Sequence, residues 1–437
     1  MMPRFAYSLL LYLLTPLILL RLFWRGRKQP EYRQNIGERF GFYGQQGKNP
    51  EKQPTIWLHA VSVGETRAAQ PLIDALQARW PSHRILLTGM TPTGRATGHE
   101  VYGDRVIQAY LPYDLPGAVD RFFRHFSPDF GVLMETEIWP NLLASAQRRN
   151  IPVLLVNARL SARSAKSYGR IAALVRPAFA ALTSVAAQTA ADAERLGALG
   201  ARTVEVCGNL KFDVLPPSER LALGQTWRSA IGNRPVWLAA STREGEEALI
   251  LDAWRRHGGP SCLLVLVPRH PQRFADVAAL LETQQFKYVR RSQGLPDNAT
   301  QVWLGDSMGE MAAYYTMADL AFIGGSLLAL GGQNLIEAAA CHCPVLVGPH
   351  TFNFLRATED AIAAGAALRV SDPDALIVAV DRLLNAKSRS TKELAAMQQA
   401  AIEFATAHRG ATRRTLSLIE RDSGMNSAPN PAQPAGH

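Results

Sequence analysis

The sequence predicts an α/β protein built from two doubly wound parallel sheets that face each other across a cleft. Short apolar runs rich in Val, Ile and Leu alternate with helical patterns, which is typical of βαβ units. This series stops at Leu215-Pro216-Pro217 and then starts again, which indicates a linker between two halves. At 437 residues the chain is long enough for two or three separate hydrophobic cores.

The segment before the first predicted strand has the features of a membrane anchor. Phe5 to Leu20 carries no charge, and Leu22-Phe23-Trp24 extends the apolar stretch beyond Arg21 to about 30 Å of helix, the thickness of a hydrocarbon core. A cleaved signal peptide is disfavoured because no small-residue cleavage site follows and the basic residues lie on the wrong side. We therefore expect residues 1–24 to form an anchor helix, which either spans the bilayer or enters one leaflet.

The net charge of +10 is concentrated beside this anchor. Half of the excess lies between Arg21 and Lys48, where seven Lys or Arg residues accompany two Glu residues. Nucleic acid is a common partner of basic proteins, but a basic cluster beside a membrane segment indicates anionic lipid instead. By the positive-inside rule, the same cluster places the rest of the chain on the cytoplasmic side.

Seven apolar runs predict the strands of the first half, residues 25–215. They are Ile56–Val61, Ile85–Met90, Val106–Leu111, Phe130–Met134, Val153–Val156, Ser184–Ala187 and Val204–Val206. Helical patterns lie between most of them, the first from Glu65 to about Arg79.

Six further runs predict the strands of the second half, residues 216–421. They are Val236–Ala240, Cys262–Val267, Tyr288–Arg290, Val302–Leu304, Leu320–Ile323 and Val345–Val347. A helix is predicted from Leu394 to Glu420. Residues 422–437 have almost nothing to bury and are predicted to be disordered.

The first strand leads into Ser62-Val63-Gly64-Glu65, where the next helical pattern begins. Ligands of open α/β sheets bind at the carboxyl ends of strands, so the Glu65 carboxylate could act there as a catalytic base. The alternative is a first-turn acid that only interacts with the helix dipole. Because a helix N-terminus stabilises a charged carboxylate, we expect the pKa of Glu65 to be lowered.

Glu135 and Glu137 follow the predicted strand Phe130–Met134. Carboxylates beside a buried strand are costly unless they are paired or used. Side chains two apart in an extended segment face the same way, so both could share one site, and the residues alone favour neither. Lys211, at the end of the first half, could reach a departing phosphate. The alternatives are a buried ion pair for the acids and a surface position for Lys211.

Two glycine-rich turns in the second half follow one another. Gly324-Gly325-Ser326 ends a predicted strand, and Gly331-Gly332-Gln333-Asn334 opens a predicted helix. That helix continues through Leu335, Ile336 and Glu337. Glycines at a strand end let backbone N–H groups approach a phosphate, and Glu337 could accept hydrogen bonds from ribose hydroxyls. Together the two turns favour a nucleotide site.

Two more strand ends in the second half carry groups suited to a nucleotide. Pro268 and Arg269 follow one strand, and Arg269 is a fixed cation for a phosphate or carboxylate unless it is merely solvated. Gly309, Glu310 and Met311 follow another, where their amides and the Glu310 carboxylate could hold a base or ribose.

Ten motifs in this order resemble the 3-deoxy-D-manno-octulosonic acid (Kdo) transferases, glycosyltransferases of family 30. The motifs extend to about Phe354 and are SVGE, TGMTPTG, LPYD, METEIWPN, NARLSARS, GNLKFD, PRHP, GDSMGE, GGS and GGQNLIEAA. The resemblance implies the GT-B fold, in which two Rossmann-like domains face each other across a cleft and a C-terminal helix packs back onto the first domain.

The resemblance also implies an activity. It is the inverting transfer of Kdo from CMP-Kdo to a tetraacyl lipid A precursor, in lipopolysaccharide core biosynthesis at the cytoplasmic side of the inner membrane. By resemblance, Glu65 accepts the proton, Glu135 and Lys211 stabilise the transition state, and the first half binds the acceptor. The resemblance also implies that CMP is held by the matching positions, which are Pro268, Arg269, Gly309 to Met311 and Asn334 to Glu337. Because this chain has Leu335 and Ile336, we expect those two side chains to affect packing only.

We expect no metal cofactor. The leaving group carries a single phosphate, so Arg269, Lys211 and helix N-termini can stabilise it. No DxD-like pair stands at a strand end, and the four cysteines have no zinc-site spacing.

Two other functions fit the same fold. One is another GT-B nucleotide-sugar enzyme, such as an epimerase, against which the membrane segment and the basic cluster argue. The other is a catalytically inactive, membrane-tethered nucleotide-binding scaffold, against which the presence of both Glu65 and Lys211 argues.

Overall fold

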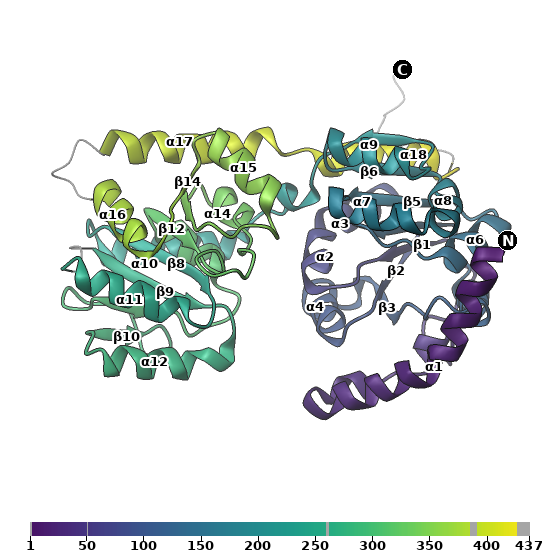
Figure 1. Ribbon diagram of the computed structural model, residues 1–437, viewed down its shortest axis with the longest axis horizontal. Helices are drawn as coiled ribbons and strands as arrows, with labels where there is room; N and C mark the ends of the chain where they lie inside the picture. Colours follow the sequence, from purple (N-terminus) through teal and green to yellow (C-terminus); the bar gives the residue numbers. More distant parts are fainter. Residues whose placement is uncertain (1, 50, 259–261, 385–390, 426–437) are drawn as a thin grey trace, which may run out of the picture. The chain divides into compact units, whose positions relative to one another are not determined.

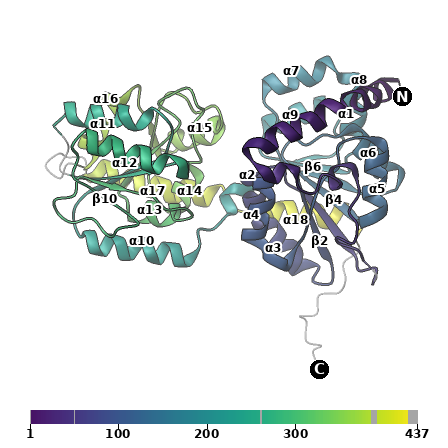
Figure 2. The ribbon, with the colours of Figure 1, turned by 90° about the horizontal axis from the view of Figure 1, so that it is seen from below.

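The computed structural model, which describes residues 2–49, 51–258, 262–384 and 391–425, consists of two α/β units (Figure 1). Unit 1 comprises Met1–Val214 and Arg409–His437, and unit 2 comprises Leu215–His408. The linker predicted at Leu215–Pro217 begins at this boundary. Each unit has one parallel sheet with helices on both faces (Figure 2), so the predicted fold class is confirmed. The cleft expected between the halves stays a prediction.

The sheet of unit 1 has the strand order β3-β2-β1-β4-β5-β6-β7. Its strands are β1 (Thr55–His59), β2 (Arg84–Gly89), β3 (Ile107–Tyr110), β4 (Phe130–Met134), β5 (Val153–Ala158), β6 (Ser184–Ala187) and β7 (Val204–Val206). In the central register Ile56 lies opposite Ile85 on one side and Phe130 on the other. All seven predicted strands are confirmed.

Helices of unit 1 are α1 (Met2–Lys28), α2 (Val63–Ala68), α3 (Gln70–Arg79), α4 (Pro92–Tyr102), α5 (Pro116–Phe126), α6 (Pro140–Arg148), α7 (Ala162–Arg170), α8 (Ala172–Ala180), α9 (Ala190–Ala198) and α18 (Ala411–Asp422). Short 3₁₀ turns are η1 (Pro30–Arg33), η2 (Glu38–Phe40), η3 (Gly103–Arg105) and η4 (Leu210–Asp213).

The prediction of a single helix from Glu65 to Arg79 is wrong. This segment divides into α2 and α3 because Pro71 has no N–H to donate to the carbonyl four residues earlier.

The sheet of unit 2 has the order β10-β11-β9-β8-β12-β13-β14. Its strands are β8 (Val236–Thr242), β9 (Leu263–Pro268), β10 (Tyr288–Arg290), β11 (Val302–Leu304), β12 (Leu320–Ile323), β13 (Val345–Val347) and β14 (Ala367–Arg369). Its helices are α10 (Ser218–Ile231), α11 (Glu246–Arg256), α12 (Phe274–Thr283), α13 (Met311–Met317), α14 (Ile336–Ala340), α15 (Leu355–Ala363), α16 (Pro373–Leu384) and α17 (Thr391–Ala407), with the 3₁₀ turn η5 (Pro271–Arg273). The six predicted strands are confirmed, and β14 was not predicted.

The C-terminal segment forms two helices where the sequence predicted one. α17 belongs to unit 2, whereas α18 belongs to unit 1. The break contains Gly410 in the left-handed region, with φ of 89°. The Asp213 carboxylate accepts hydrogen bonds from the N–H groups of Gly410 (2.7 Å) and Thr412 (2.6 Å), which fixes the start of α18. The prediction of a disordered tail from residue 422 is wrong at its start, because Asp422 ends α18 and Ser423 is buried. Residues 426–437 lie outside the described residues.

α1 is the one helix, in the part of the chain that the structure describes, that is long and apolar enough to cross a membrane. The candidate span is Pro3–Arg27. Figure 1 shows α1 in dark purple, with its N-terminal end beside α6. An N-terminal membrane helix is therefore compatible with the structure.

Basic residues after α1 do not all face outward. Arg39, in η2, is 2% exposed, and its guanidinium lies 4.0 Å from the Tyr110 ring centroid. It also donates a hydrogen bond to the carbonyl of Met90 at 3.1 Å. The expectation that the whole cluster between Arg21 and Lys48 faces lipid is therefore wrong for Arg39.

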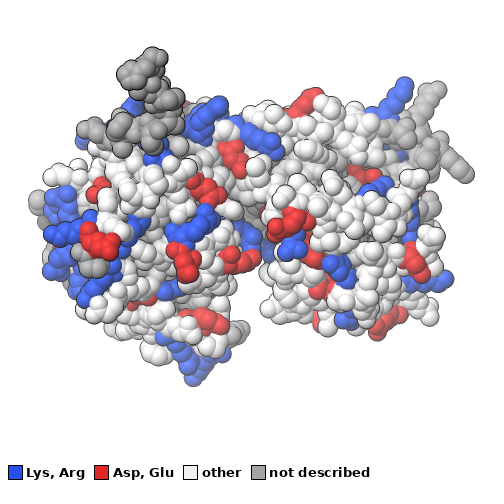
Figure 3. Space-filling view, turned by 180° about the vertical axis from the view of Figure 1, so that it is seen from behind, with Lys and Arg blue, Asp and Glu red and all other residues white. Residues whose placement is uncertain are grey.

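The positive charge does not form one continuous field on the face drawn in Figure 3. There, blue Lys and Arg side chains lie in separate groups with red Asp and Glu side chains among them. A continuous basic stripe is the footprint of a nucleic-acid site, so this face gives no support to such a partner.

Candidate active site

Glu65 lies in the first turn of α2, directly after β1. The Val61 N–H donates to its Oε2 at 2.7 Å, and the Ser62 hydroxyl donates to its Oε1 at 3.0 Å. Ser62 is also the N-cap of α2. The hydroxyl of Thr91, after β2, donates to the Val61 carbonyl at 3.1 Å. The carboxylate is thus held in place at the carboxyl edge of the sheet, with only 9% of the residue exposed.

Burial raises the pKa of Glu65 to about 7. The hydrogen bond from Val61 opposes this shift, and the negative charges of Glu135 and Glu137 add to it. The lowered pKa expected from the helix N-terminus is therefore wrong, because α2 has only six residues and desolvation outweighs its dipole. A carboxylate that titrates near neutral pH is well matched to general-base catalysis.

Glu135 and Lys211 form an ion pair near Glu65. Lys211 Nζ lies 3.0 Å from Glu135 Oε1, and both side chains stay about one-fifth exposed. Glu135 opens a turn after β4 with a left-handed φ of 57°, and its N–H donates to the Val156 carbonyl of β5. Asn157 Oδ1 accepts from the N–H of the residue before Lys211 at 3.1 Å, which fixes η4 against β5. Three elements of unit 1 thus bring the pair together.

Glu137 does not share the environment of Glu135. The extended segment expected across these acids is wrong, because the chain turns at Glu135. Burial raises the pKa of Glu137, the Trp139 indole lowers it, and the charge of Glu135 raises it further. The structure therefore distinguishes the two acids: Glu135 is the one paired with Lys211.

In unit 2, cationic groups gather at the carboxyl ends of β8 and β9. Pro268 is buried at the end of β9, and Arg269 after it is exposed. The Arg269 guanidinium donates to Gln333 Oε1 at 3.3 Å. Burial lowers the pKa of the neighbouring His270, and the charges of Arg243 and Arg269 lower it further. Arg243, which sequence reasoning missed, is thus a second cation at this edge.

The first glycine-rich turn of unit 2 is held by a buried carboxylate. Glu246, at the start of α11, accepts hydrogen bonds from the N–H groups of Gly325 (2.5 Å), Leu327 (3.0 Å) and Arg243 (2.9 Å). Ser326 is fully buried and donates to the Ile323 carbonyl. Contrary to the expectation from its glycines, the Gly325 N–H is therefore occupied and not free for a phosphate. Sequence reasoning missed Glu246, although Gly245-Glu246 repeats the Gly64-Glu65 pattern.

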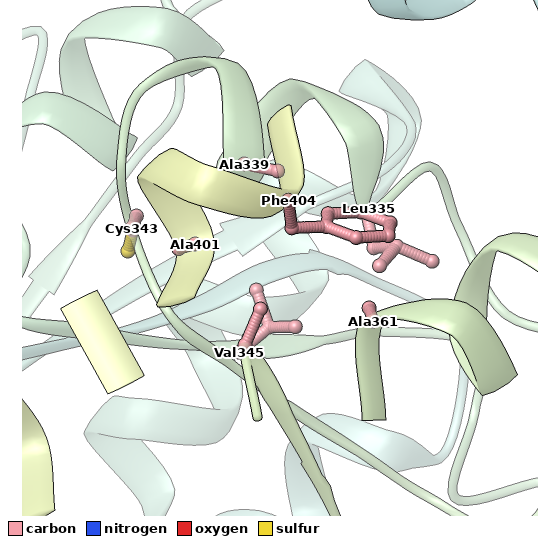
Figure 4. Close-up of a pocket in the computed structure, with 8 residues that line it drawn as sticks. Leu335, Ala339, Cys343, Val345, Ala361, Ala401 and Phe404 are labelled. Atoms are coloured by element: carbon pink, nitrogen blue, oxygen red, sulfur yellow. The ribbon is translucent and has the colours of Figure 1, made fainter. Parts of the chain in front are cut away.

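The second glycine-rich turn leaves polar side chains at the surface. Asn334 Oδ1 accepts from the Ile336 N–H (3.2 Å), and its Nδ2 donates to Glu337 Oε1 (3.1 Å). Glu337 is exposed, whereas Leu335 and Ile336 are buried. Figure 4 shows Leu335 against Phe404 of α17, in packing that leaves essentially no cavity. The two apolar side chains pack as expected, and Asn334 and Glu337 remain available to a ligand.

Gly309 and Glu310 directly precede α13, and Met311 is its first residue. Gly309 has a left-handed φ of 74°. The Glu310 carboxylate accepts from Ser307 and lies 3.2 Å from Arg291 and 3.7 Å from Arg220. Because these groups already engage the carboxylate, the backbone of this turn is better placed than the side chain to contact a ligand.

No metal-binding arrangement of three or more His, Cys, Asp or Glu side chains occurs among the described residues. The four cysteines form no disulfide. Metal independence stays a prediction.

Comparison with known proteins decides the family. Residues 34–214 match the family described as 3-Deoxy-D-manno-octulosonic-acid transferase (kdotransferase). The 3-deoxy-D-manno-octulosonic acid transferase of Bordetella pertussis is 46% identical, over 96% of this chain and 99% of the relative. The chain belongs to the Kdo transferase family. Another Kdo transferase, from Haemophilus influenzae, is 41% identical over 96% of this chain and 98% of its own length. The resemblance carried by the ten motifs, and the glycosyltransferase class, are confirmed.

Solved structures support the fold independently. A putative UDP-N-acetylglucosamine 2-epimerase from Listeria monocytogenes has a TM-score of 0.57 and covers 84% of this chain and 96% of its own. At 15% identity the likeness shows the fold alone. A fold of two parallel sheets is thus shared by this Kdo transferase family member and a putative epimerase, so the family, not the fold, separates these two functions.

Proposed function

We propose that this protein transfers Kdo from CMP-Kdo to a tetraacyl lipid A precursor, with inversion at the anomeric carbon. The observation that carries the proposal is Glu65, with a pKa of about 7, beside the Glu135–Lys211 ion pair at one sheet edge. The names and high identity of the two bacterial relatives support the choice of donor sugar.

In the reaction, Glu65 removes the proton of a sugar hydroxyl on the acceptor. The oxygen forms a bond to the anomeric carbon of Kdo, while the bond from that carbon to the phosphate oxygen breaks and CMP leaves with the electron pair. With a pKa of about 7, a large share of Glu65 is ionised at neutral pH. Lys211 supplies a positive charge for the leaving phosphate, and Glu135 orients Lys211 and stabilises positive charge that develops on the sugar ring.

Unit 2 holds CMP in this proposal. Arg269 and Arg243 bind the phosphate, because a guanidinium is a fixed cation with several donors. Glu337 and Asn334 accept and donate hydrogen bonds at the ribose. The remaining contacts come from Pro268, Gly309, Glu310 and Met311, largely through the backbone. Gly325 and Ser326 do not contact CMP directly. They are held by Glu246 and fix the conformation of the loop after β12. No metal ion takes part.

The membrane provides the acceptor. α1 anchors the protein to the inner membrane with its globular units on the cytoplasmic side, since the basic residues that follow α1 suit the anionic lipid surface of the cytoplasmic leaflet. Anionic lipid and the phosphates of the acceptor attract the exposed Arg21, Arg25 and Arg27.

Mass spectrometry of the acceptor tests the proposal. Purified protein is incubated with CMP-Kdo and the tetraacyl precursor, and the product is expected to gain the mass of Kdo. An epimerase would instead convert a nucleotide sugar without acceptor, and an inactive scaffold would bind CMP without turnover. Either result would overturn the assignment.

A further inference from the structure

The first turns of α1 are fastened to unit 1 by polar contacts. Ser8 Oγ lies 3.2 Å from Asn141 Oδ1 and 3.0 Å from its Nδ2, and the Tyr7 hydroxyl hydrogen-bonds to the Asp114 carboxylate. Asp114 is buried and accepts from the N–H groups of Asn141 (2.9 Å) and Leu142 (2.8 Å), which caps α6. The N-terminal end of α1 is therefore part of the folded unit.

These contacts do not fit a helix that crosses the bilayer. Ser8 and Trp24 are separated by about 24 Å of helix, so a crossing helix would place Ser8 near the far side of the hydrocarbon. Asp114 and Asn141, and the folded unit around them, would then have to enter the hydrocarbon, where buried polar groups without water are costly. α1 therefore fits a helix that lies in the membrane surface.

The outward side of α1 suits that placement. Apolar side chains that are at least half exposed recur every three or four residues along it: Phe5, Leu9, Leu13, Leu17, Leu20 and Trp24. An apolar ridge on a helix whose other side is held by a protein is a typical surface for insertion among lipid acyl chains.

Beneath α1 lies a cavity of about 520 Å³, within the usual size range of ligand pockets, about 300–1,000 Å³. Its lining is mainly apolar and comes from Tyr12, Thr15, Pro16 and Leu19 of α1, from Phe40 of η2, and from Leu115, Gly117, Ala118 and Arg121 at and before α5. Tyr12 and Pro16 line the cavity and are also exposed. The cavity therefore opens toward the apolar surface of α1.

A fixed cation stands in the cavity wall. The Arg121 guanidinium donates two hydrogen bonds to the Phe40 carbonyl, at 3.0 and 2.7 Å, and lies 4.3 Å from the Phe42 ring centroid. A Cβ placed on Gly117 would lie 3.5 Å from Arg121 Nη1 and 3.7 Å from the Tyr12 hydroxyl. An apolar pocket with a cation and a hydroxyl in its wall suits an acyl chain attached to a phosphorylated head group.

A series of hydrogen bonds links the wall of the cavity to the sheet edge that carries the proposed base. η2, whose last residue lines the cavity, also contains Arg39, which donates to the Met90 carbonyl after β2. Thr91 donates to the carbonyl of Val61, and the Val61 N–H holds Glu65. A lipid with one chain in the cavity would therefore have its head group on the side of Glu65.

We infer that this cavity binds one acyl chain of the acceptor lipid while α1 lies in the membrane surface. The identity of the lipid rests on the proposed function. A bilayer phospholipid is the less suitable occupant. Its head group is small and is not an acceptor for Kdo, so the position of the cavity on the side of Glu65 would serve no purpose for it.

Leu19→Trp tests the inference, because the larger side chain fills the cavity from α1. Leu20→Trp is the matched control, since Leu20 lies on the exposed ridge and not in the cavity lining. Native mass spectrometry measures binding of the tetraacyl precursor to the full-length protein. We expect Leu19→Trp to weaken binding at least tenfold and Leu20→Trp to leave it unchanged. Turnover on a deacylated disaccharide bisphosphate acceptor should be equal in both variants.

Three results would overturn the inference: unchanged binding in Leu19→Trp, equal weakening in both variants, or binding of phosphatidylglycerol at the same site with equal affinity. If Leu19→Trp lowers the melting temperature strongly, Gly117→Val fills the cavity from α5 and decides instead. If wild-type protein transfers no Kdo but Leu19→Trp still loses the lipid, the proposed function fails and the cavity assignment stands. If wild-type protein transfers Kdo and the two variants bind the lipid equally, the cavity assignment fails and the proposed function stands.

Discussion

The two units place a glutamate at corresponding positions and use it differently. Each has a Gly-Glu pair after its first central strand, Gly64-Glu65 after β1 and Gly245-Glu246 after β8. Glu246 is completely buried and accepts hydrogen bonds from three backbone N–H groups, two of which lie in the loop after β12. It therefore joins α11 to that loop. Glu65 accepts one backbone N–H and one hydroxyl.

What separates a structural carboxylate from a reactive one here is the set of neighbours. Three N–H donors compensate the negative charge of Glu246. Glu65 has fewer donors and stands near Glu135 and Glu137, so burial and like charges raise its pKa. A carboxylate that is only partly compensated retains affinity for a proton, which is the property that a general base needs.

Glu246→Ala should have the largest effect on the molecule. It leaves three backbone N–H groups without an acceptor, two of them buried and that of Arg243 partly buried, and we expect the free energy of unfolding to fall by about 3–5 kcal/mol. Denaturant unfolding measures this loss, and CMP affinity should fall with it. Glu244→Ala in the same loop is the control, because Glu244 is exposed. A loss below about 1 kcal/mol, the worth of a single ordinary hydrogen bond, would show that Glu246 does not fasten the loop.

Glu65→Gln should act on turnover instead. The amide oxygen keeps the bond from Val61 and the amide nitrogen can donate to Ser62, but the side chain cannot accept the proton. We expect turnover to fall by at least about 10²-fold, with CMP affinity nearly unchanged. Glu100→Gln, on the exposed side of α4, should retain full activity. Retained turnover in Glu65→Gln would remove Glu65 from the mechanism.

The pH dependence of stability gives a third comparison. Glu65 has a folded pKa of about 7, above its ordinary value of 4.5, so its contribution to stability is fully present below about pH 4.5 and is lost as the pH rises through 7. Glu65→Gln has no such loss, so its free energy of unfolding relative to wild type should rise by about 1–3 kcal/mol between about pH 4.5 and 8. Burial also raises the pKa of Asp114 to about 7. Asp114 is present in both proteins, so its contribution cancels in the difference between them. A difference that stays constant with pH would contradict the buried, partly compensated state of Glu65.

Ser62→Ala should have the smallest effect. It makes the surroundings of Glu65 even less like those of Glu246, because the carboxylate of Glu65 loses one of its two donors. It removes the N-cap of α2 and a donor to the carboxylate, so stability should fall by about 1 kcal/mol. The pH at which activity rises should move upward, because a hydrogen bond that lowers the pKa is gone. Ser161→Ala removes the exposed N-cap of α7 and should lower stability without moving the pH profile. A downward movement in Ser62→Ala would reverse the argument.

The sequence predicted what apolar patterns and turn residues determine, and missed what depends on the folded surroundings. Strands such as Phe130–Met134 have long apolar runs and were found, whereas β14 has three residues ending in Arg369 and no such pattern. The position of Glu65 was predicted from its place after a strand. The direction of its pKa shift was predicted wrongly, because burial and the approach of Glu135 arise only from tertiary packing. Glu246 has the same local sequence, and only the folded loop shows that its oxygens are occupied.

Because α18 belongs to unit 1, that unit is interrupted in sequence by the whole of unit 2. Leu418 and Ile419 of α18 are buried in the same apolar cluster as Leu58 and Leu210. During synthesis the ribosome must add about 200 residues after η4 before α18 emerges, which takes about 10–40 s at typical rates of about 5–20 residues per second. Throughout that interval the nascent chain exposes the apolar surface that α18 later covers. We therefore expect newly made unit 1 to be a client for chaperones until α18 has left the ribosome.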